Sequence, residues 1–327
     1  MPEVQRTMSM PGVTFGRREF LRGGAAATAM LAWRGRGAWA QAPAAGDRVA
    51  QTRAMGATAT LTVVPLRGNV SMIESSGFGN MAVLTGPDGK LVVDSGYSSA
   101  RPHVEAVLTG LGSMPVRTLV NTHWHFDHTD GNEWMHGAGA TIVAQDNTRK
   151  RLSGPHEWPA MGMRFDAAPK GAWPVVCFKE ALTMYMNGAT VTMEHYKPAH
   201  TDSDISVRFD ELNVVHLGDT YFRSFPVIDG SSDGSIRGMI AAAERSLGQV
   251  DRETKIIPGH GPLGDAATLK EYHAMLVDVA DRVGSLKAAG KSVDEAIAAK
   301  PTARYDEAWG KGFVTPELFV RMVYPGV

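Results

Sequence analysis

The chain has 327 residues, a length that is enough for one large or two small globular domains. Of these residues 43% are hydrophobic and 20% are charged, which is typical of a globular protein. Its formal net charge of −1 gives no electrostatic case for binding nucleic acid, and we expect no nucleic-acid partner. The single cysteine, Cys177, excludes an intramolecular disulfide framework.

The first 40 residues are typical of an export signal. Segment 16–22, with its arginine pair, resembles a twin-arginine signal, an apolar run follows at 25–33, and 38–40 fits a small-x-small cleavage site. The apolar run is too short to span a bilayer, so we expect no permanent membrane anchor. A disordered basic tail is the alternative. The order of these features favours a bacterial protein that is periplasmic or secreted after twin-arginine export.

The rest of the chain is predicted to form one domain. Residues 41–58 are small and polar and predict a linker, so the folded domain is expected at 59–327. A β-type pattern begins at residue 61, and a Gly-Pro-Asp-Gly turn marks a hairpin. The predicted elements of the first half are strands at 80–85, 91–94, 118–121 and 141–144, and a helix at 101–111.

The second half repeats this order, starting with a hairpin across Asn187-Gly188, a favoured tight-turn pair. Strands are predicted at 181–185, 190–196, 205–209, 214–217 and 255–257, and helices at 235–247, 265–288 and 315–324. Strand-rich and helical segments thus alternate twice. This organisation predicts an α/β fold in which two packed sheets carry helices on their outer faces, a four-layer sandwich.

One short segment predicts a metal site. Residues 123–128 hold three histidines and a carboxylate in the pattern His-x-His-x-Asp-His, namely His123, His125, Asp127 and His128. Imidazole and carboxylate are ligands of zinc and similar metals, whereas apolar cores avoid carboxylates. Because a predicted strand leads directly into the segment, a tight loop there can aim several ligands at one point.

Further ligands are expected where other strands end. His200, Asp219 and His260 each follow a predicted strand, and the glycines beside His260 permit a sharp turn. By contrast, His216 lies inside a predicted strand, so its side chain is expected to point elsewhere.

Taken in series, these positions resemble the metallo-β-lactamase-fold superfamily of hydrolases, over roughly residues 60–275. The motifs that carry the resemblance are Asp94, the 123–128 cluster, His200, Asp219 and His260. The resemblance implies the four-layer αβ/βα sandwich of that superfamily. It also implies two zinc ions, with iron or manganese as alternatives: one held by His123, His125 and His200, one by Asp127, His128 and His260, and both bridged by Asp219. Asp94 would orient a ligand histidine.

The same resemblance implies a reaction. A metal-bound hydroxide, hydrogen-bonded to the catalytic Asp127, would attack the carbonyl of a small lactam, lactone, ester or thioester. Export makes a β-lactam the leading specific candidate. However, β-lactamases of this fold usually have cysteine or serine where this chain has Asp219. A glyoxalase II-like thioesterase or a lactonase is therefore the alternative.

Two readings from other classes stay open. Some relatives of this fold, similar to persulfide dioxygenases, carry one iron and perform redox chemistry, although Asp219 together with His260 favours two metals. The second alternative is an exported binding protein that has no catalytic activity. For the substrate pocket we expect walls from Trp158 and Phe222, with Tyr196 or Tyr221 as hydrogen-bond donors. The alternative is that these four residues only pack locally. The sequence does not indicate which oligomeric state the protein adopts.

Overall fold

The fold was established from a computed structural model, which describes residues 45–327. The predicted export signal at 1–40 lies outside the described residues. Within the described part of the chain, no helix combines the length and the apolar character needed to cross a membrane.

The predicted linker differs from what the structure contains. Residues Ala45–Ala54 form α1, and Met55–Thr58 continue it as the 3₁₀ helix η1. Val49 is buried, and Arg48 donates a hydrogen bond to the carbonyl of Met161 at 3.0 Å. The segment has little apolar periodicity of its own, so tertiary packing determines its structure.

The first sheet has seven strands in the order β1-β2-β3-β4-β5-β6-β9. Its strands are β1 (Leu61–Arg67), β2 (Val70–Ser75), β3 (Met81–Leu84), β4 (Lys90–Val93), β5 (Val116–Val120), β6 (Thr141–Gln145) and β9 (Val176–Phe178). Strands β1 to β4 pair antiparallel, and β4, β5, β6 and β9 pair in parallel. A separate hairpin, β7 (His156–Trp158) with β8 (Met163–Phe165), lies in the connection between β6 and β9.

The second sheet has five strands, β10 (Ala181–Met186), β11 (Ala189–His195), β12 (Ile205–Phe209), β13 (Val214–His216) and β14 (Lys255–Ile257). All neighbours pair antiparallel except β13 and β14, which are parallel. Asn187 and Gly188 both have positive φ angles, 54° and 77°, as the tight turn between β10 and β11 requires.

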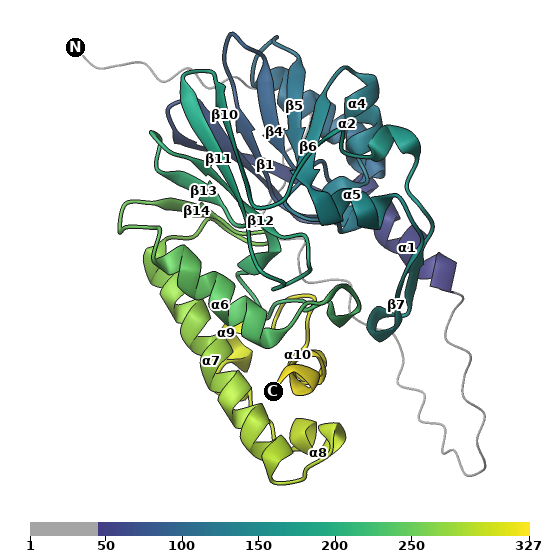
Figure 1. Cartoon of the computed structure of the whole chain (residues 1–327), viewed down its shortest axis with the longest axis vertical. Coiled ribbons are helices and arrows are strands. Elements are labelled where there is room, and N and C mark those ends of the chain that lie inside the picture. The colour runs from purple at the N-terminus through teal and green to yellow at the C-terminus, as the bar shows by residue number, and fades with distance from the viewer. Residues whose placement is uncertain (1–44) are drawn as a thin grey trace, which may run out of the picture. The chain divides into compact units, whose positions relative to one another are not determined.

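The two sheets pack face to face, and helices cover their outer faces (Figure 1). Leu84, Val93 and Val120 point into the core between the sheets, whereas their neighbours Val83 and Val92 point to the helix-covered face. This alternation is the period of two that a strand buried on both sides requires. The predicted four-layer sandwich is confirmed.

The helices divide between the two outer layers. Beside the first sheet lie α2 (Arg101–Gly110), α3 (Phe126–Thr129), α4 (Asn132–Gly137) and α5 (Asp146–Leu152), and beside the second lie α6 (Ile236–Leu247) and α7 (Ala266–Ala288) (Figure 1). The chain closes with α8 (Val293–Ala298), α9 (Asp306–Trp309) and α10 (Pro316–Val323), which pack on α7 and on the loops after β13.

Candidate metal centre

Strand direction brings the predicted ligands to one edge of the sandwich. β4 and β5 are parallel, so Asp94 and the 123–128 segment leave the first sheet at the same edge. β13 and β14 are also parallel, and β11 runs with them because both β11 and β13 are antiparallel to β12. His200, Asp219 and His260 therefore leave the second sheet together.

All seven predicted donors meet at this edge. Three overlapping groups have their ligand atoms within 4.8 Å of one another: His123, His125 and His200; His123, His128 and Asp219; and Asp127, His128 and His260. His125 Nδ1 lies 2.8 Å from His200 Nε2, and His260 Nε2 lies 3.2 Å from Asp127 Oδ2. Asp219 contacts both sides of the cluster, at 3.5 Å from His200 Nε2 and 3.1 Å from His128 Nε2.

In four of the histidines, the ring nitrogen that does not face the cluster forms a hydrogen bond with a partner outside it. The pairs are His123 Nδ1 with Thr122 Oγ1 (3.0 Å), His125 Nε2 with Asp229 Oδ2 (3.1 Å), His128 Nδ1 with Asp94 Oδ2 (2.8 Å) and His200 Nδ1 with the Val227 carbonyl (2.8 Å). Such bonds fix the tautomer and the orientation of a ring. The second nitrogen of each ring faces the cluster, where it can bind a cation when the ring is neutral.

The predicted partner Asp94 sits in a demanding conformation. Its φ of 63° is in the left-handed region, which costs a non-glycine residue about 1 kcal/mol or more. Its carboxylate accepts hydrogen bonds from the Thr122 backbone N–H (2.7 Å) and hydroxyl (2.8 Å) as well as from His128. These buried contacts hold the strained residue in place. They also connect the carboxylate to two histidines, to His128 directly and to His123 through the Thr122 hydroxyl.

The donor set fits a divalent cation. His123 Nε2 and Asp219 Oδ1 are buried without any hydrogen-bond partner, a costly arrangement for polar atoms unless a cation accepts their lone pairs. The packing also leaves no room for larger residues beside the donors. A Cβ on Gly259 would lie 1.9 Å from Asp219 Oδ1, and one on Gly79 would lie 2.1 Å from the His128 ring.

Charges inside the cluster shift its pKa values in opposite directions. Burial lowers the pKa of His200 to about 4, despite the opposing effect of Asp219. For His260 burial acts in the same direction, but the carboxylates of Asp219 and Asp127 prevail and raise its pKa to about 9. Burial alone would raise the pKa of Asp127, yet His128 and His260 hold it well below its usual range. Asp127 is therefore ionised at neutral pH.

The cluster forms the floor of a cavity of about 430 Å³. The donors that reach it are His125, Asp127, His200, Asp219 and His260, and the aromatic side chains around them are Phe78, Tyr97, Phe126, Trp158, Phe222 and Phe225. Trp158 stacks on His125 at 4.7 Å between ring centroids, and Phe222 stacks on His260 at 5.4 Å. Trp158 and Phe222 thus lie on the cavity wall, the position that we expected for them.

The two tyrosines predicted as donors do not reach the cavity. Tyr196 packs against α6, where its hydroxyl bonds to Ser246 Oγ (2.7 Å), and the Tyr221 hydroxyl donates to Thr268 Oγ1 (2.9 Å) on α7. Tyr97 lines the cavity instead. Burial and the nearby Asp127 and Asp130 carboxylates raise the pKa of Tyr97, so its hydroxyl stays protonated.

Sequence reasoning also missed Asp229, the partner of His125. Its segment, Asp-Gly-Ser-Ser, is a recognisable turn signal, because the Asp229 side chain accepts a hydrogen bond from the Ser231 backbone N–H at 2.9 Å. The turn does not reveal which distant histidine it meets. His216 behaves as expected: its Nε2 donates to the Asn80 carbonyl at 3.1 Å, outside the donor groups.

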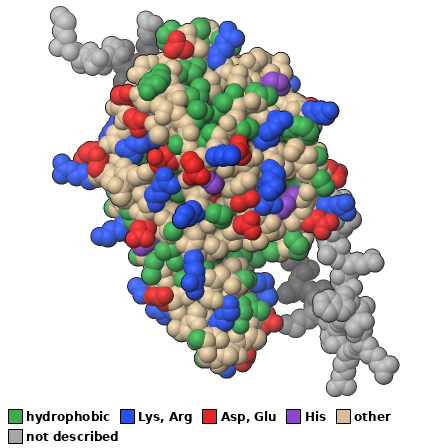
Figure 2. All heavy atoms as spheres, viewed as in Figure 1, with side chains coloured by type: hydrophobic (Ala, Val, Ile, Leu, Met, Phe, Trp, Pro, Cys, Tyr) green, Lys and Arg blue, Asp and Glu red, His purple; other side chains and the backbone are tan. Residues whose placement is uncertain are grey.

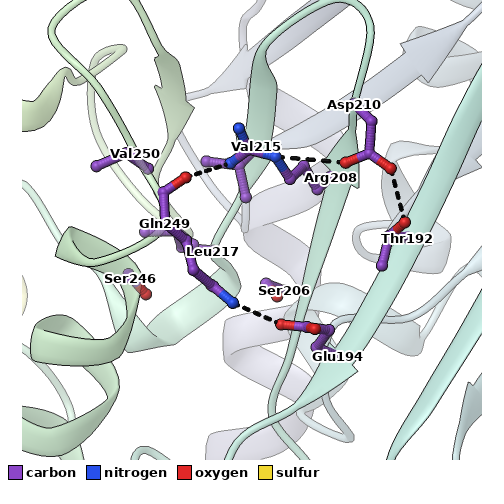
Figure 3. Close-up of a pocket in the computed structure, with 10 residues that line it drawn as sticks. All are labelled: Thr192, Glu194, Ser206, Arg208, Asp210, Val215, Leu217, Ser246, Gln249 and Val250. Carbon is purple, nitrogen blue, oxygen red and sulfur yellow. Dashed lines mark hydrogen bonds and ion pairs between the residues drawn. The ribbon is translucent and has the colours of Figure 1, made fainter.

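A second hollow, of about 290 Å³, lies on the outer face of the second sheet beside α6 (Figure 3). Its charged groups already have partners: Arg208 Nε lies 3.3 Å from Asp210 Oδ1, and Glu194 accepts a hydrogen bond from the Gln249 amide at 2.7 Å. Figure 2 shows acidic and basic side chains interspersed on the face in view. Neither feature adds donors to the cluster.

The chain belongs to the metallo-β-lactamase superfamily. The model of the "Metallo-beta-lactamase superfamily" matches residues 76–260, more than half of the chain, and this range contains all seven donors. Superfamily members are generally metal-dependent hydrolases that act on small molecules, and the His/Asp groups described above suit a divalent metal.

A curated relative is the 2,4-dinitroanisole O-demethylase subunit alpha of Nocardioides sp. (strain JS1661), 24% identical over 212 residues. The match covers 62% of this chain and 58% of the relative, so the chain spans less than two thirds of that protein.

Solved structures share the fold. A metallo-beta-lactamase from Pontibacter korlensis is 19% identical with a TM-score of 0.54, covering 67% of this chain and all (100%) of that one. The sec-alkylsulfatase Pisa1 from Pseudomonas sp. is 15% identical with a TM-score of 0.63, covering 81% of this chain and 50% of that one. DIM-1 metallo-beta-lactamase is 18% identical with a TM-score of 0.51, covering 66% and 96%. At such identities the likeness establishes the fold alone.

Proposed function

We propose that this protein is a dinuclear, zinc-dependent hydrolase that cleaves a small molecule at a carbonyl group. The supporting observation is the convergence of seven donors on the floor of an open cavity. His123, His125 and His200 would hold one cation and Asp127, His128 and His260 the other, with Asp219 between them. A pair of divalent cations supplies an activated water and a Lewis acid for the carbonyl oxygen.

The chain's own residues supply orientation and exclusion of water. Asp127 is ionised, and its side chain is 17% exposed at the cavity floor, so it accepts a hydrogen bond from the attacking water. Asp94 acts through His128, whose ring it holds at 2.8 Å. The protonated Tyr97 hydroxyl is available as a donor to the substrate. Trp158 and Phe222 shield the floor, which strengthens every electrostatic interaction there.

A β-lactam stays the leading specific substrate in this proposal. Among the described residues that line the cavity, Arg223 is the only lysine or arginine, and a guanidinium suits the carboxylate that β-lactam antibiotics carry. Asp219 favours the alternative, a glyoxalase II-like thioesterase or a lactonase. The name of the Nocardioides relative adds a third candidate, cleavage of an aryl ether, for which the aromatic cavity wall is suited.

Metal analysis and a substrate panel test the proposal together. The purified protein is assayed for bound metal and then for hydrolysis of a chromogenic cephalosporin, lactones, thioesters, aryl esters and 2,4-dinitroanisole, with and without a chelator. Two zinc ions per chain and chelator-sensitive turnover of a carbonyl substrate are expected, and Asp127→Asn should lower kcat. One iron per chain without hydrolysis would overturn the proposal in favour of a redox enzyme.

We also propose that the protein is exported through the twin-arginine route, which rests on segment 16–40 of the sequence. Cell fractionation with mass measurement tests this: a periplasmic species beginning at Gln41 is expected. Replacing Arg17 and Arg18 by lysine should retain the protein in the cytoplasm, whereas an unprocessed wild-type protein in the cytoplasm would refute export.

A further inference from the structure

We propose that the substrate is an acyl compound with an extended apolar tail, and that the apolar cavity walls, including segments outside the superfamily match, bind this tail. The inference rests on the proposed function, because it names the substrate class of the same site. It goes further by assigning specificity to residues that hold no metal, chiefly Met55 and Phe313.

The cavity has a polar floor and apolar walls. Above the donors, three separate segments contribute the walls: Met55 from η1, Met161 and Met163 from the β7–β8 hairpin, and Phe313 with Val314 from the α9–α10 loop. None of these five side chains can take part in acid–base or metal chemistry with a carbonyl group. Their contribution to a ligand is buried apolar area.

Two of these residues are unusual for their exposure. Met55 is 53% exposed and Phe313 is 69% exposed, and both line this cavity. Large apolar side chains that gather around one opening mark a binding site more often than isolated ones do. Tyr185, which is 82% exposed on β10, gives the contrast because it lies outside the cavity lining.

Apart from the Tyr97 hydroxyl near the floor, the wall hydroxyls of Ser75 and Thr52 are already engaged within the protein. Ser75 Oγ accepts hydrogen bonds from the backbone N–H groups of Gly77 and Phe78, both at 3.2 Å. Thr52 Oγ1 donates to the Arg48 carbonyl at 2.8 Å. A sugar-like or peptide-like substrate body would therefore find few free partners here. An apolar body loses nothing on entering and gains the burial of its surface.

Two wall residues lie outside the region that matches the superfamily, and the C-terminal one is firmly supported. Met55 and Phe313 both lie outside residues 76–260, which match the superfamily. The C-terminal wall is tied to the cavity by Phe225, whose N–H donates to the Trp309 carbonyl at 2.8 Å and whose ring stacks on Phe319 at 4.8 Å. The metal donors thus come from the matched region, and the tail-binding surface combines the β7–β8 hairpin of that region with segments on both sides of it.

Binding of straight-chain carboxylates tests the inference without requiring turnover. Calorimetry on the zinc-loaded protein compares butanoate, hexanoate, octanoate and decanoate, whose carboxylates stand in for the acid product. Each methylene that the walls cover should tighten binding about fourfold. In the double variant Met55→Ser/Phe313→Ala the ratio of decanoate to butanoate affinity should fall about tenfold or more, whereas Tyr185→Ala should keep the wild-type ratio.

A parallel assay separates this inference from the proposed function. Ratios of kcat/KM for p-nitrophenyl decanoate over the acetate should follow the same pattern across the variants. Chain-length-dependent binding without turnover of any carbonyl substrate in the panel above would leave the tail site standing and refute the hydrolase. Turnover with affinities that do not change with chain length, or an equal effect from Tyr185→Ala, would overturn the tail site and leave the hydrolase standing.

Discussion

At the residue scale, Asp229 matters although it is not among the proposed ligands. It is fully buried, and its Oδ2 faces His125 Nε2 at 3.1 Å while its Oδ1 accepts from the Ser231 backbone. Burial works against ionisation, but His125 and the serine hydrogen bonds lower the pKa of Asp229. The carboxylate therefore keeps a proton on His125 Nε2 and leaves Nδ1 free to face His200.

Removing this carboxylate should weaken the centre. We expect Asp229→Ala to lower zinc affinity about 10- to 100-fold, because a ligand histidine that loses its outer partner loses its tautomer and orientation. Competition with a chelating dye at constant pH measures the change. Asp233→Ala, four residues along the same loop and exposed, is the matched control and should bind zinc as the wild type does. Equal affinities in all three proteins would contradict the role given to Asp229.

Metal affinity should also depend on pH through His260. The pKa of His260 is raised to about 9, so below pH 9 a cation must displace a proton from it. Protons compete most strongly at low pH, and His128 must also lose a proton, because Asp219, Asp127 and Asp94 raise its pKa well above the usual range despite its burial. Zinc affinity should therefore rise from pH 7 to 9, by up to about tenfold per pH unit for each of the two histidines. Calorimetry in buffers of different ionisation enthalpy should detect protons released when the ions bind. Affinity that is flat over this range would refute the assignment.

At the element scale, α10 supports the cavity wall. Phe319 on α10 is fully buried and stacks on Phe225, while Phe313 in the preceding loop is 69% exposed. We expect Phe319→Ala to lower the free energy of unfolding by about 3–5 kcal/mol, because a large buried side chain leaves a cavity. Phe313→Ala should change it by less than about 0.5 kcal/mol. Urea unfolding of the zinc-loaded proteins compares the two, and similar losses would mean that the wall does not depend on α10.

Elements with strong patterns of their own were predictable. Strands 205–209 and 255–257 coincide with β12 and β14, since both are short apolar runs between turn signals. The β7–β8 hairpin and α1 were missed because each has weak periodicity and is stabilised by packing against the other. The contacts that hold α1, such as the buried Val49, the Arg48–Met161 hydrogen bond and the Arg53–Asp130 ion pair at 2.7 Å, join residues far apart in the chain, so the sequence could not reveal them.

The site, like the fold, contains some residues that the sequence could predict and others that it could not. Ligands at strand ends could be predicted because strand direction alone brings them together. Tyr196 and Tyr221 follow or precede ligands closely in sequence, but their side chains point to the helix layer, where each finds a hydroxyl partner. Tyr97 and Asp229 were not found, because their place in the site depends on how distant loops fold against it.

At the scale of the whole molecule, the proposed centre joins the two sheets. The 123–128 segment follows β5 of the first sheet, whereas Asp219 and His260 follow β13 and β14 of the second. Asn80 reinforces this junction without metal, through hydrogen bonds from its side chain to the carbonyls of Pro258 (3.0 Å) and Gly261 (2.8 Å).

Removal of metal should therefore affect global stability. A ligand that binds only the folded state stabilises it by about 4 kcal/mol at a thousand times its Kd, so a chelator should lower Tm by about 5–10 °C. Differential scanning calorimetry with and without chelator measures this. The variant His123→Ala/His260→Ala should show no chelator effect. A wild-type Tm that ignores the chelator would mean that no cation joins the sheets.

The spread of the donors along the chain also sets an order of events during synthesis. Segment 123–128 leaves the ribosome long before His260, and in that interval it has only its own four donors to offer. A cation captured then would be held by a partial set, without Asp219 or the second sheet. The complete site exists only after β14 has joined β13, so correct metal selection must follow the folding of the second half.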